Sequence, residues 1–183
     1  MQTQRIILSG SGGQGVITAA IILAEAAVVY EDLNAVQTQS YGPESRGGAT
    51  RADVILSDEP IYYPKVDQPN FAACLTQQAY NRYSWSIRPG GLLLTDRRYV
   101  RQDPRVDARQ VALGMYDAVV NDIGNPVVFN ICMLGALVGL TGLVRPESIA
   151  RVLETRIPAD FLDMNRTALQ AGLDLAAEMS HHA

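Results

Sequence analysis

The residues best suited to chemistry in this sequence are glycines close to the N-terminus. Gly10-Ser11-Gly12-Gly13-Gln14-Gly15 follows a short apolar segment that starts at Arg5, and it precedes an Ala-, Ile- and Leu-rich run from Val16 to Val29. A buried strand, a glycine-rich turn and a helix in this order bring free backbone N–H groups and the positive end of the helix dipole together. The pattern GxGxxG in this context predicts a site for a phosphate group.

Two other interpretations of these glycines stay open. A dinucleotide site for NAD or FAD needs an acidic residue at the end of the second strand to hold the ribose hydroxyls. The second predicted strand ends in Gln37-Thr38-Gln39-Ser40, whereas Glu31 and Asp32 precede it, so the missing contact disfavours a dinucleotide. Alternatively, the glycines only allow the strand and the helix to pack closely, a role that the third glycine has even in true sites.

A second glycine-rich segment, Tyr41 to Gly48, lies just beyond the second predicted strand. Loops that follow the strands of a doubly wound sheet share its carboxyl edge, so we expect this segment to face the first glycine loop. Arg46 stands beside Gly47-Gly48, where a guanidinium and backbone amides would hold a phosphate. Glu44 either orients Arg46 or is a surface carboxylate, and the residues alone favour a phosphate contact and an ordinary surface ion pair equally for Arg46.

The elements that must position these segments alternate between strands and helices. We expect strands over residues 5–10, 34–40, 49–56, 71–75 and 92–95, and helices over 16–29, 77–86, 127–140 and 161–179. The alternation predicts an α/β fold with a single doubly wound, mostly parallel sheet, helices on both faces and a helical C-terminal third. The length of 183 residues and the absence of a repeat or linker predict one domain over residues 1–183.

The composition excludes several classes of function. A net charge of −4 lacks the basic footprint of a nucleic-acid-binding protein. The first apolar segment is too short for a signal peptide, and the apolar stretch Val127 to Leu143 is interrupted by Asn130 and glycines, so it suits a buried helix better than a membrane span. We therefore expect a cytoplasmic protein without membrane contact.

The sequence offers no metal-binding or catalytic constellation. Its two cysteines, Cys74 and Cys132, lie far apart and form no CxxC pair, so we expect buried thiols rather than ligands of zinc or an iron–sulfur cluster. His181 and His182 stand at the extreme C-terminus, where a general base is not expected. We predict no catalytic residue and no metal site in this chain.

Two further groups of side chains suggest surface or core positions. Residues 96–109 contain five arginines among polar residues, and a solvated loop is favoured over a phosphate site there. Tyr62 and Tyr63 precede Pro64. Stacking on an adenine or packing on a partner chain are alternatives for them, but we expect at least one to pack in the core.

Taken in order, several segments resemble the gamma subunits of 2-oxoacid:ferredoxin oxidoreductases. The residues that carry the resemblance are Gly12-Gly13-Gln14-Gly15-Val16, Gln39-Ser40-Tyr41-Gly42-Pro43-Glu44-Ser45-Arg46-Gly47-Gly48, Ser57-Asp58-Glu59-Pro60-Ile61, Pro89-Gly90-Gly91, Gly124-Asn125-Pro126 with Asn130, and Met133-Leu134-Gly135-Ala136-Leu137. The loop from Tyr41, with Tyr63-Pro64-Lys65-Val66 after it, is most similar to the gamma subunits of 2-oxoglutarate enzymes. Pyruvate and branched-chain 2-oxoacid versions are close.

The resemblance implies a non-catalytic subunit, inactive alone, of an enzyme that converts a 2-oxoacid, CoA and oxidised ferredoxin to acyl-CoA, CO2 and reduced ferredoxin. It implies thiamine diphosphate, magnesium and 4Fe-4S clusters in partner subunits. The implied partners are thiamine-bearing alpha and beta subunits and a ferredoxin-like delta subunit or domain, with ferredoxin as the electron acceptor of the complex. This chain would hold no cofactor alone, but it would contact the nucleotide end of CoA.

The resemblance also assigns residues to that CoA contact. The residues implied are Gly12, Gly13, Gln14 and Gly15 from the first loop and Tyr41, Glu44, Ser45, Arg46, Gly47 and Gly48 from the second. Arg46 would lie nearest a phosphate. Relatives with this domain fused into a longer chain have lysines where Glu44 and Ser45 stand, so details of the CoA contact are expected to differ here. A free-standing nucleotide-binding oxidoreductase and a purely structural assembly subunit are the alternative functions.

Overall fold

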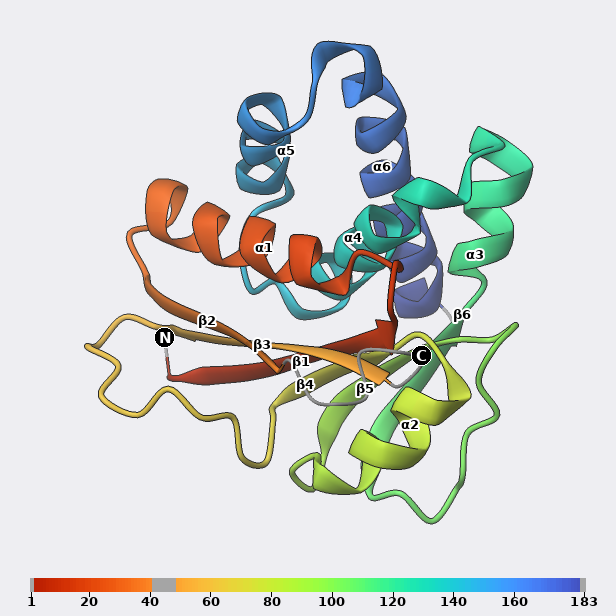
Figure 1. Ribbon diagram of the computed structural model, residues 1–183. Coiled ribbons are helices and arrows are strands. Elements are labelled where there is room, and N and C mark those ends of the chain that lie inside the picture. The colour runs from red at the N-terminus through yellow and green to blue at the C-terminus, as the bar shows by residue number, and fades with distance from the viewer. Residues whose placement is uncertain (1, 41–48, 182–183) are drawn as a thin grey trace.

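The computed structural model describes residues 2–40 and 49–181, which form a six-stranded sheet with helices on both faces (Figure 1). The strand order is β2-β3-β1-β4-β5-β6. The strands are β1 (Gln4–Ser11), β2 (Asn34–Ser40), β3 (Ala49–Ser57), β4 (Phe71–Cys74), β5 (Gly91–Asp96) and β6 (Ala108–Leu113). Only β3 runs against its neighbours, since it pairs antiparallel with both β1 and β2 while β1, β4, β5 and β6 pair in parallel. The prediction of an α/β fold with a mostly parallel sheet is confirmed.

Most of the helices lie on one side of this sheet. The helices are α1 (Val16–Tyr30), α2 (Gln77–Tyr83), α3 (Met115–Ala118), α4 (Phe129–Thr141), α5 (Pro146–Arg156) and α6 (Ala159–His181). Figure 1 shows α1, α4, α5 and α6 above the sheet and α2 alone below it. Within the described residues, no helix combines the length and apolar character that crossing a membrane requires.

The two faces of the sheet bury different side chains because successive residues of a strand point to opposite sides. On β1, Ile6 and Leu8 belong to the large core between the sheet and the helices α1 and α4. Ile7 belongs to the smaller core between the sheet and α2. All six residues of β5, which lies between β4 and the edge strand β6, are buried. The sheet is therefore the shared wall of two apolar cores, and the loops at its edges are left for binding.

Helix α4 lies inside the larger core and crosses α6 at very short range. Its residues from Phe129 to Val138 are buried, which matches its apolar character on every side. A Cβ atom added to Gly135 would lie 2.2 Å from the carbonyl oxygen of Leu169, and one added to Gly172 would lie 2.0 Å from that of Cys132. The absence of side chains at Gly135 and Gly172 allows the two backbones to approach this closely.

Several sequence-based expectations need correction. The arginine-rich segment predicted as a loop over residues 96–109 contains the start of β6 at Ala108, because this short edge strand pairs with the fully buried β5. The predicted helix over residues 77–86 ends as an α-helix at Tyr83 and continues as one 3-10 turn, Ser84–Ser86. The expectation that Tyr62 or Tyr63 packs in the core is wrong, since their exposed fractions are 90% and 57% on an irregular surface loop.

Candidate functional site

The glycine loop connects the end of β1 to the start of α1 and is closed by Gln14. The Gln14 backbone N–H donates to the carbonyl of Ser11 (3.2 Å), and the Ser11 N–H donates to Gln14 Oε1 (2.7 Å). Gly13 and Gly15 have φ values of 88° and 71°, which side chains disfavour. The Gln14 oxygen is therefore occupied in shaping the loop.

Among the described residues, no side chain caps the N-terminus of α1. Gly15 occupies the cap position without a capping hydrogen bond, and the first turn contains no acidic residue. The carbonyl of Gly15 instead accepts the first helical hydrogen bond, from the N–H of Ala19 (3.0 Å), and a second one from Asn130 Nδ2 (3.1 Å). The first N–H groups of an α-helix have no partner within the helix, so together with the helix dipole they favour an anion at this end.

A hollow of about 430 Å³ adjoins the glycine loop. Gly12, Gly13 and Gln14 of the glycine loop form one wall. The remaining lining residues form the other: Tyr116, Asn125, Pro126, Val127 and Phe129. Tyr116 meets Phe129 edge-on with ring centroids 5.5 Å apart, and Tyr99 meets Tyr116 in the same way at 5.0 Å. The hollow therefore has a polar backbone wall facing an aromatic one.

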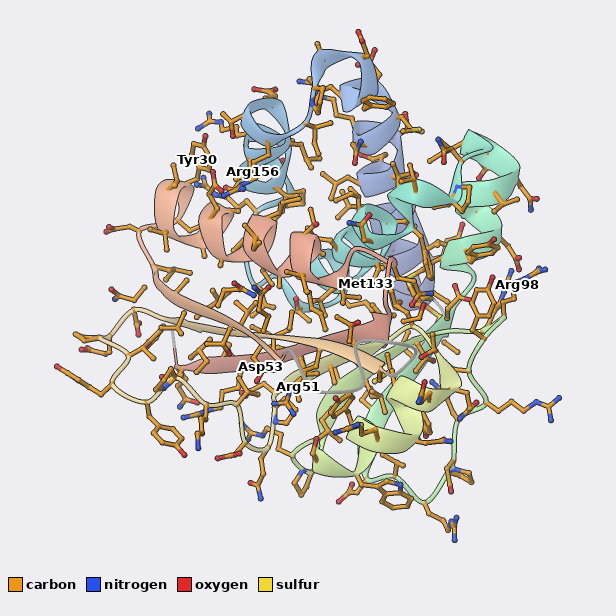
Figure 2. The ribbon with its side chains drawn as sticks, viewed as in Figure 1. Tyr30, Arg51, Asp53, Arg98, Met133 and Arg156 are labelled. Carbon is orange, nitrogen blue, oxygen red and sulfur yellow. The ribbon has the colours of Figure 1, made fainter. Side chains whose placement is uncertain are left out.

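Arg98 and Asp96 hold the aromatic wall in place. The Arg98 guanidinium carbon lies 5.6 Å from the centre of the Tyr116 ring, and Arg98 Nη1 pairs with Asp117 Oδ1 at 2.9 Å. Figure 2 shows Arg98 beneath the start of α3. The buried carboxylate of Asp96 accepts from the backbone N–H groups of Arg98 (2.9 Å) and Tyr116 (2.8 Å). Desolvation by burial raises the pKa of Asp96 despite these two hydrogen bonds.

The structure brings part of the predicted site together. Gly12, Gly13, Gln14 and Gly15 all lie in the loop at the carboxyl end of β1, as predicted. The other predicted residues, Tyr41, Glu44, Ser45, Arg46, Gly47 and Gly48, lie outside the described residues. The strands that flank that segment end at the same edge, since Ser11 pairs with Ala49, and Ser40 pairs with Arg51.

The aromatic wall was missed by reasoning from the sequence. Tyr116 stands in a short helical turn between β6 and a π-helical turn, Val119–Ile123, where no periodic pattern distinguishes it. The only signal was Gly124-Asn125-Pro126 with Asn130, which entered through the resemblance alone. Asn125 caps the turn Pro126–Val128 by accepting from the Val127 N–H at 3.1 Å. This cap fixes the part of the segment that faces Gly12 and Gly13.

The alternative acidic residue for a dinucleotide ribose lies in the wrong place. Glu31 follows α1 at the end opposite the glycine loop, and 15 residues at a rise of about 1.5 Å put roughly 22 Å between the two ends. Its carboxylate accepts from the Arg145 N–H (2.9 Å) and from the Ser148 hydroxyl at the start of α5. Burial alone would raise the pKa of Glu31, but the hydrogen bonds from Ser148 and Arg145 lower it. Glu31 thus links the end of α1 to the start of α5 through hydrogen bonds.

The arginine-rich segment and the cysteines behave largely as expected. Side chains of the arginines between β5 and β6 are exposed, and Arg105 pairs with Asp103 at 2.6 Å. Burial raises the pKa of both Cys74 and Cys132 to about 12. The described part of the chain contains no group of three or more His, Cys, Asp or Glu side chains that fits a metal ion.

Comparison with known sequences identifies relatives along nearly the whole chain. The family model described as pyruvate ferredoxin/flavodoxin oxidoreductase matches residues 5–175. The 2-oxoglutarate synthase subunit KorC of Methanocaldococcus jannaschii is 43% identical over 178 residues, which is 96% of this chain and 95% of that protein. The pyruvate synthase subunit PorC of Methanothermobacter marburgensis is 33% identical over 168 residues, covering 87% of this chain and 89% of that protein.

Solved structures show the same fold. The keto/oxoacid ferredoxin oxidoreductase gamma subunit of Geobacter sulfurreducens superposes with a TM-score of 0.90 at 40% identity, over 97% of this chain and 98% of that one. The 2-oxoglutarate:ferredoxin oxidoreductase of Magnetococcus marinus, solved with 2-oxoglutarate, coenzyme A and succinyl-CoA, has a TM-score of 0.86 at 21% identity, over 97% of this chain and 32% of that one. The chain therefore belongs to the pyruvate ferredoxin/flavodoxin oxidoreductase family, in which the relatives of matching length are single subunits of 2-oxoacid oxidoreductases.

Proposed function

We propose that this chain is the gamma subunit of a 2-oxoglutarate:ferredoxin oxidoreductase and works as one domain over residues 1–183. The observation that carries the proposal is the 43% identity to a 2-oxoglutarate synthase subunit over nearly the full length of both chains. The complex would convert 2-oxoglutarate, CoA and oxidised ferredoxin to succinyl-CoA, CO2 and reduced ferredoxin in the cytoplasm. The chain alone is expected to be inactive.

The redox groups are proposed to reside in partner subunits. An iron–sulfur cluster takes cysteine thiolates as ligands, whereas Cys74 and Cys132 are both buried and remain thiols. The donor set of the described residues therefore does not fit such a cluster. Thiamine diphosphate, magnesium and 4Fe-4S clusters are proposed in the partner subunits, namely thiamine-bearing alpha and beta subunits and a ferredoxin-like delta subunit or domain.

The contribution of this chain is proposed to be assembly and the nucleotide end of CoA. The uncapped start of α1 supports a phosphate at Gly12 to Gly15. Tyr116 and Phe129 across the hollow would offer an aromatic surface to the adenine. From the second glycine-rich segment, we propose Tyr41, Glu44, Ser45, Arg46, Gly47 and Gly48 as further CoA contacts, with Arg46 at a phosphate.

The test is CoA-dependent, 2-oxoglutarate-driven reduction of a low-potential dye by the complex, co-expressed from neighbouring genes. We expect Arg46→Ala to raise the CoA concentration needed for half-maximal rate by roughly tenfold, as loss of a charge-assisted hydrogen bond would do, and to keep the maximal rate. Arg105→Ala is the matched control, because it also removes one arginine but from an exposed pair with Asp103.

Each outcome separates the candidate functions. An unchanged CoA requirement in Arg46→Ala would make the chain a structural assembly subunit. A wild-type complex that turns over pyruvate but not 2-oxoglutarate would contradict the proposed substrate. Binding of a nicotinamide or flavin by the purified chain would favour a free-standing oxidoreductase, which the position of Glu31 disfavours.

A further inference from the structure

Two arginines line a hollow at the sheet edge opposite the glycine loop. Arg88 precedes β5, and Arg109 is the second residue of β6, where it pairs in register with Leu92. Both side chains line a hollow of about 260 Å³ at the amino ends of β4 and β5. The glycine loop lies at the other end of these parallel strands, so the hollow is separate from the candidate CoA site.

Neither arginine is neutralised within the described residues. Five other arginines with exposed side chains pair with carboxylates: Arg98, Arg105, Arg145, Arg156 and Arg166. Arg88 and Arg109 form no such pair there, and none of the described residues lining the hollow is acidic. The part of the chain that the structure describes thus leaves two guanidinium groups without a carboxylate at one hollow, although the net charge of the protein is −4.

Three hydrogen-bond acceptors at the hollow, on Asn70 and Arg88, are already in use. Asn70 Oδ1 accepts from the Arg5 N–H (3.0 Å), and the Asn70 carbonyl accepts from the Leu92 N–H (3.0 Å). The Arg88 carbonyl accepts from the Gly91 N–H (2.9 Å), which closes a turn with proline at its second position and Gly90 (φ 71°) at its third. A turn of this type is well defined, so it holds Arg88 at the rim. The hollow offers donors and positive charge.

The lining also contains apolar surface. Phe71 and Leu140 are half-buried and line the same hollow as the two arginines. A free inorganic anion would gain nothing from covering these side chains, whereas a protein segment would bury them while its carboxylate meets the guanidinium groups. Arginine beside partly buried apolar side chains is typical of protein interfaces.

We propose that this hollow binds an Asp- or Glu-bearing segment of a neighbouring subunit of the oxidoreductase complex. The inference rests on the proposed function only in that the chain works inside a multi-subunit assembly. It does not depend on the 2-oxoacid or on CoA. The carboxylate would sit between Arg88 and Arg109, with the surrounding residues of the segment over Phe71 and Leu140.

The test is recovery of the complex through a tag on this chain in the double variant Arg88→Glu/Arg109→Glu. We expect the apparent affinity for the partner subunits to fall at least about tenfold, because both guanidinium groups become repulsive toward a carboxylate. The control is Arg101→Glu/Arg151→Glu, which changes the net charge equally at exposed positions outside the hollow. It is expected to assemble as wild type does.

Other outcomes would overturn the proposal. Equal recovery of wild type and both variants would exclude a docking role, and equal losses in both variants would indicate a net-charge effect. Normal assembly of the Arg88/Arg109 variant, with inorganic phosphate raising the melting temperature of wild type only, would indicate a small-anion site instead.

Two further comparisons separate loss of docking from loss of stability and from failure of the proposed function. If Arg88→Glu/Arg109→Glu has a lower melting temperature than the wild type, Arg88→Gln/Arg109→Gln replaces it, because glutamine removes the positive charge without adding a negative one. A complex that assembles but does not turn over 2-oxoglutarate would contradict the proposed function and would not contradict the docking site.

Discussion

Asn130 on α4 donates a hydrogen bond from Nδ2 to the carbonyl oxygen of Gly15 at 3.1 Å, across 115 residues of sequence. The contact is close, since a Cβ atom on Gly15 would lie 2.5 Å from Asn130 Nδ2. Asn130 is 7% exposed, so its amide is almost fully withdrawn from solvent. The hydrogen bond joins the helix beside the aromatic wall to the residue at the N-cap position of α1, and thus links the two sides of the hollow.

We predict that Asn130→Asp lowers the free energy of unfolding by about 1–3 kcal/mol, because a carboxylate cannot donate and would face the Gly15 carbonyl in a buried position. Urea unfolding followed by circular dichroism measures the change. Asn81→Asp is the matched control: Asn81 Oδ1 accepts from Gln77 Nε2 at an exposed position, which a carboxylate also does. Identical unfolding midpoints for the two variants would contradict the assigned role of Asn130.

A second prediction concerns the crossing of α4 and α6. Gly172→Ala in a helix would ordinarily stabilise by about 1 kcal/mol through helix propensity. Here the new Cβ atom would lie 2.0 Å from the Cys132 carbonyl oxygen and 2.6 Å from the Ala136 backbone nitrogen, neither of which can rotate away. Because both obstacles are backbone atoms, the overpacking cost should reach at least the upper end of its usual range, about 3 kcal/mol, which leaves a net loss of roughly 2 kcal/mol.

The melting temperature of Gly172→Ala tests this balance. Gly12→Ala provides the control, because a Cβ atom there would have only Thr50 Oγ1 within 4 Å, at 3.9 Å, and Gly12 does not have a positive φ. A Gly172→Ala protein that melts at or above the wild-type temperature would mean that the helices separate easily.

The part of the site that follows from local rules was predictable. An apolar strand, glycines and an Ala-rich helix occur within one continuous segment, so β1, Gly12 to Gly15 and α1 could be assigned without tertiary information. The bounds of β2 were also predicted correctly, at Asn34–Ser40.

The aromatic wall of the hollow, across from the glycine loop, depends on contacts between segments that are distant in the sequence. Tyr116 faces the glycine loop only because Asp96, 20 residues earlier, accepts its N–H and turns the chain after β6. The antiparallel direction of β3 is likewise set by pairing with β1 and β2, because its own residues do not specify a direction. Long-range pairing of this kind leaves no periodic signal in either segment.

A third prediction concerns the thiols. Cys74 and Cys132 are both 0% exposed, and burial raises the pKa of each to about 12, so only about one molecule in 10⁴ carries a thiolate at pH 8. Ellman's reagent should label neither thiol in the native protein and both in urea. An added cysteine at exposed Gln170 serves as the positive control. Rapid labelling of Cys74 or Cys132 without urea would show that the core around it opens.

The last prediction concerns the buried carboxylate of Asp96 at the end of β5. Desolvation raises its pKa in the folded chain above the ordinary value of 3.8, although the Tyr116 and Arg98 N–H groups donate to it. Below the ordinary value, Asp96 is protonated in both the folded and the unfolded chain and has no desolvation penalty. As the pH rises through the folded-state pKa, the folded chain must hold a desolvated charge, so the raised pKa makes stability fall with rising pH.

Asp96→Asn removes this titration but also loses one of the two acceptor oxygens, which lowers stability by a constant amount. Denaturant unfolding measures the free energy of unfolding of both proteins at steps of pH just above 3.8. The difference between the wild type and Asp96→Asn should shrink as the pH rises. The lowered pKa of Asp103, about 2, acts equally in both proteins and cancels in the difference. Parallel stability curves would mean that the two hydrogen bonds offset desolvation fully, and Asp96 would then anchor Tyr116 without any pH dependence.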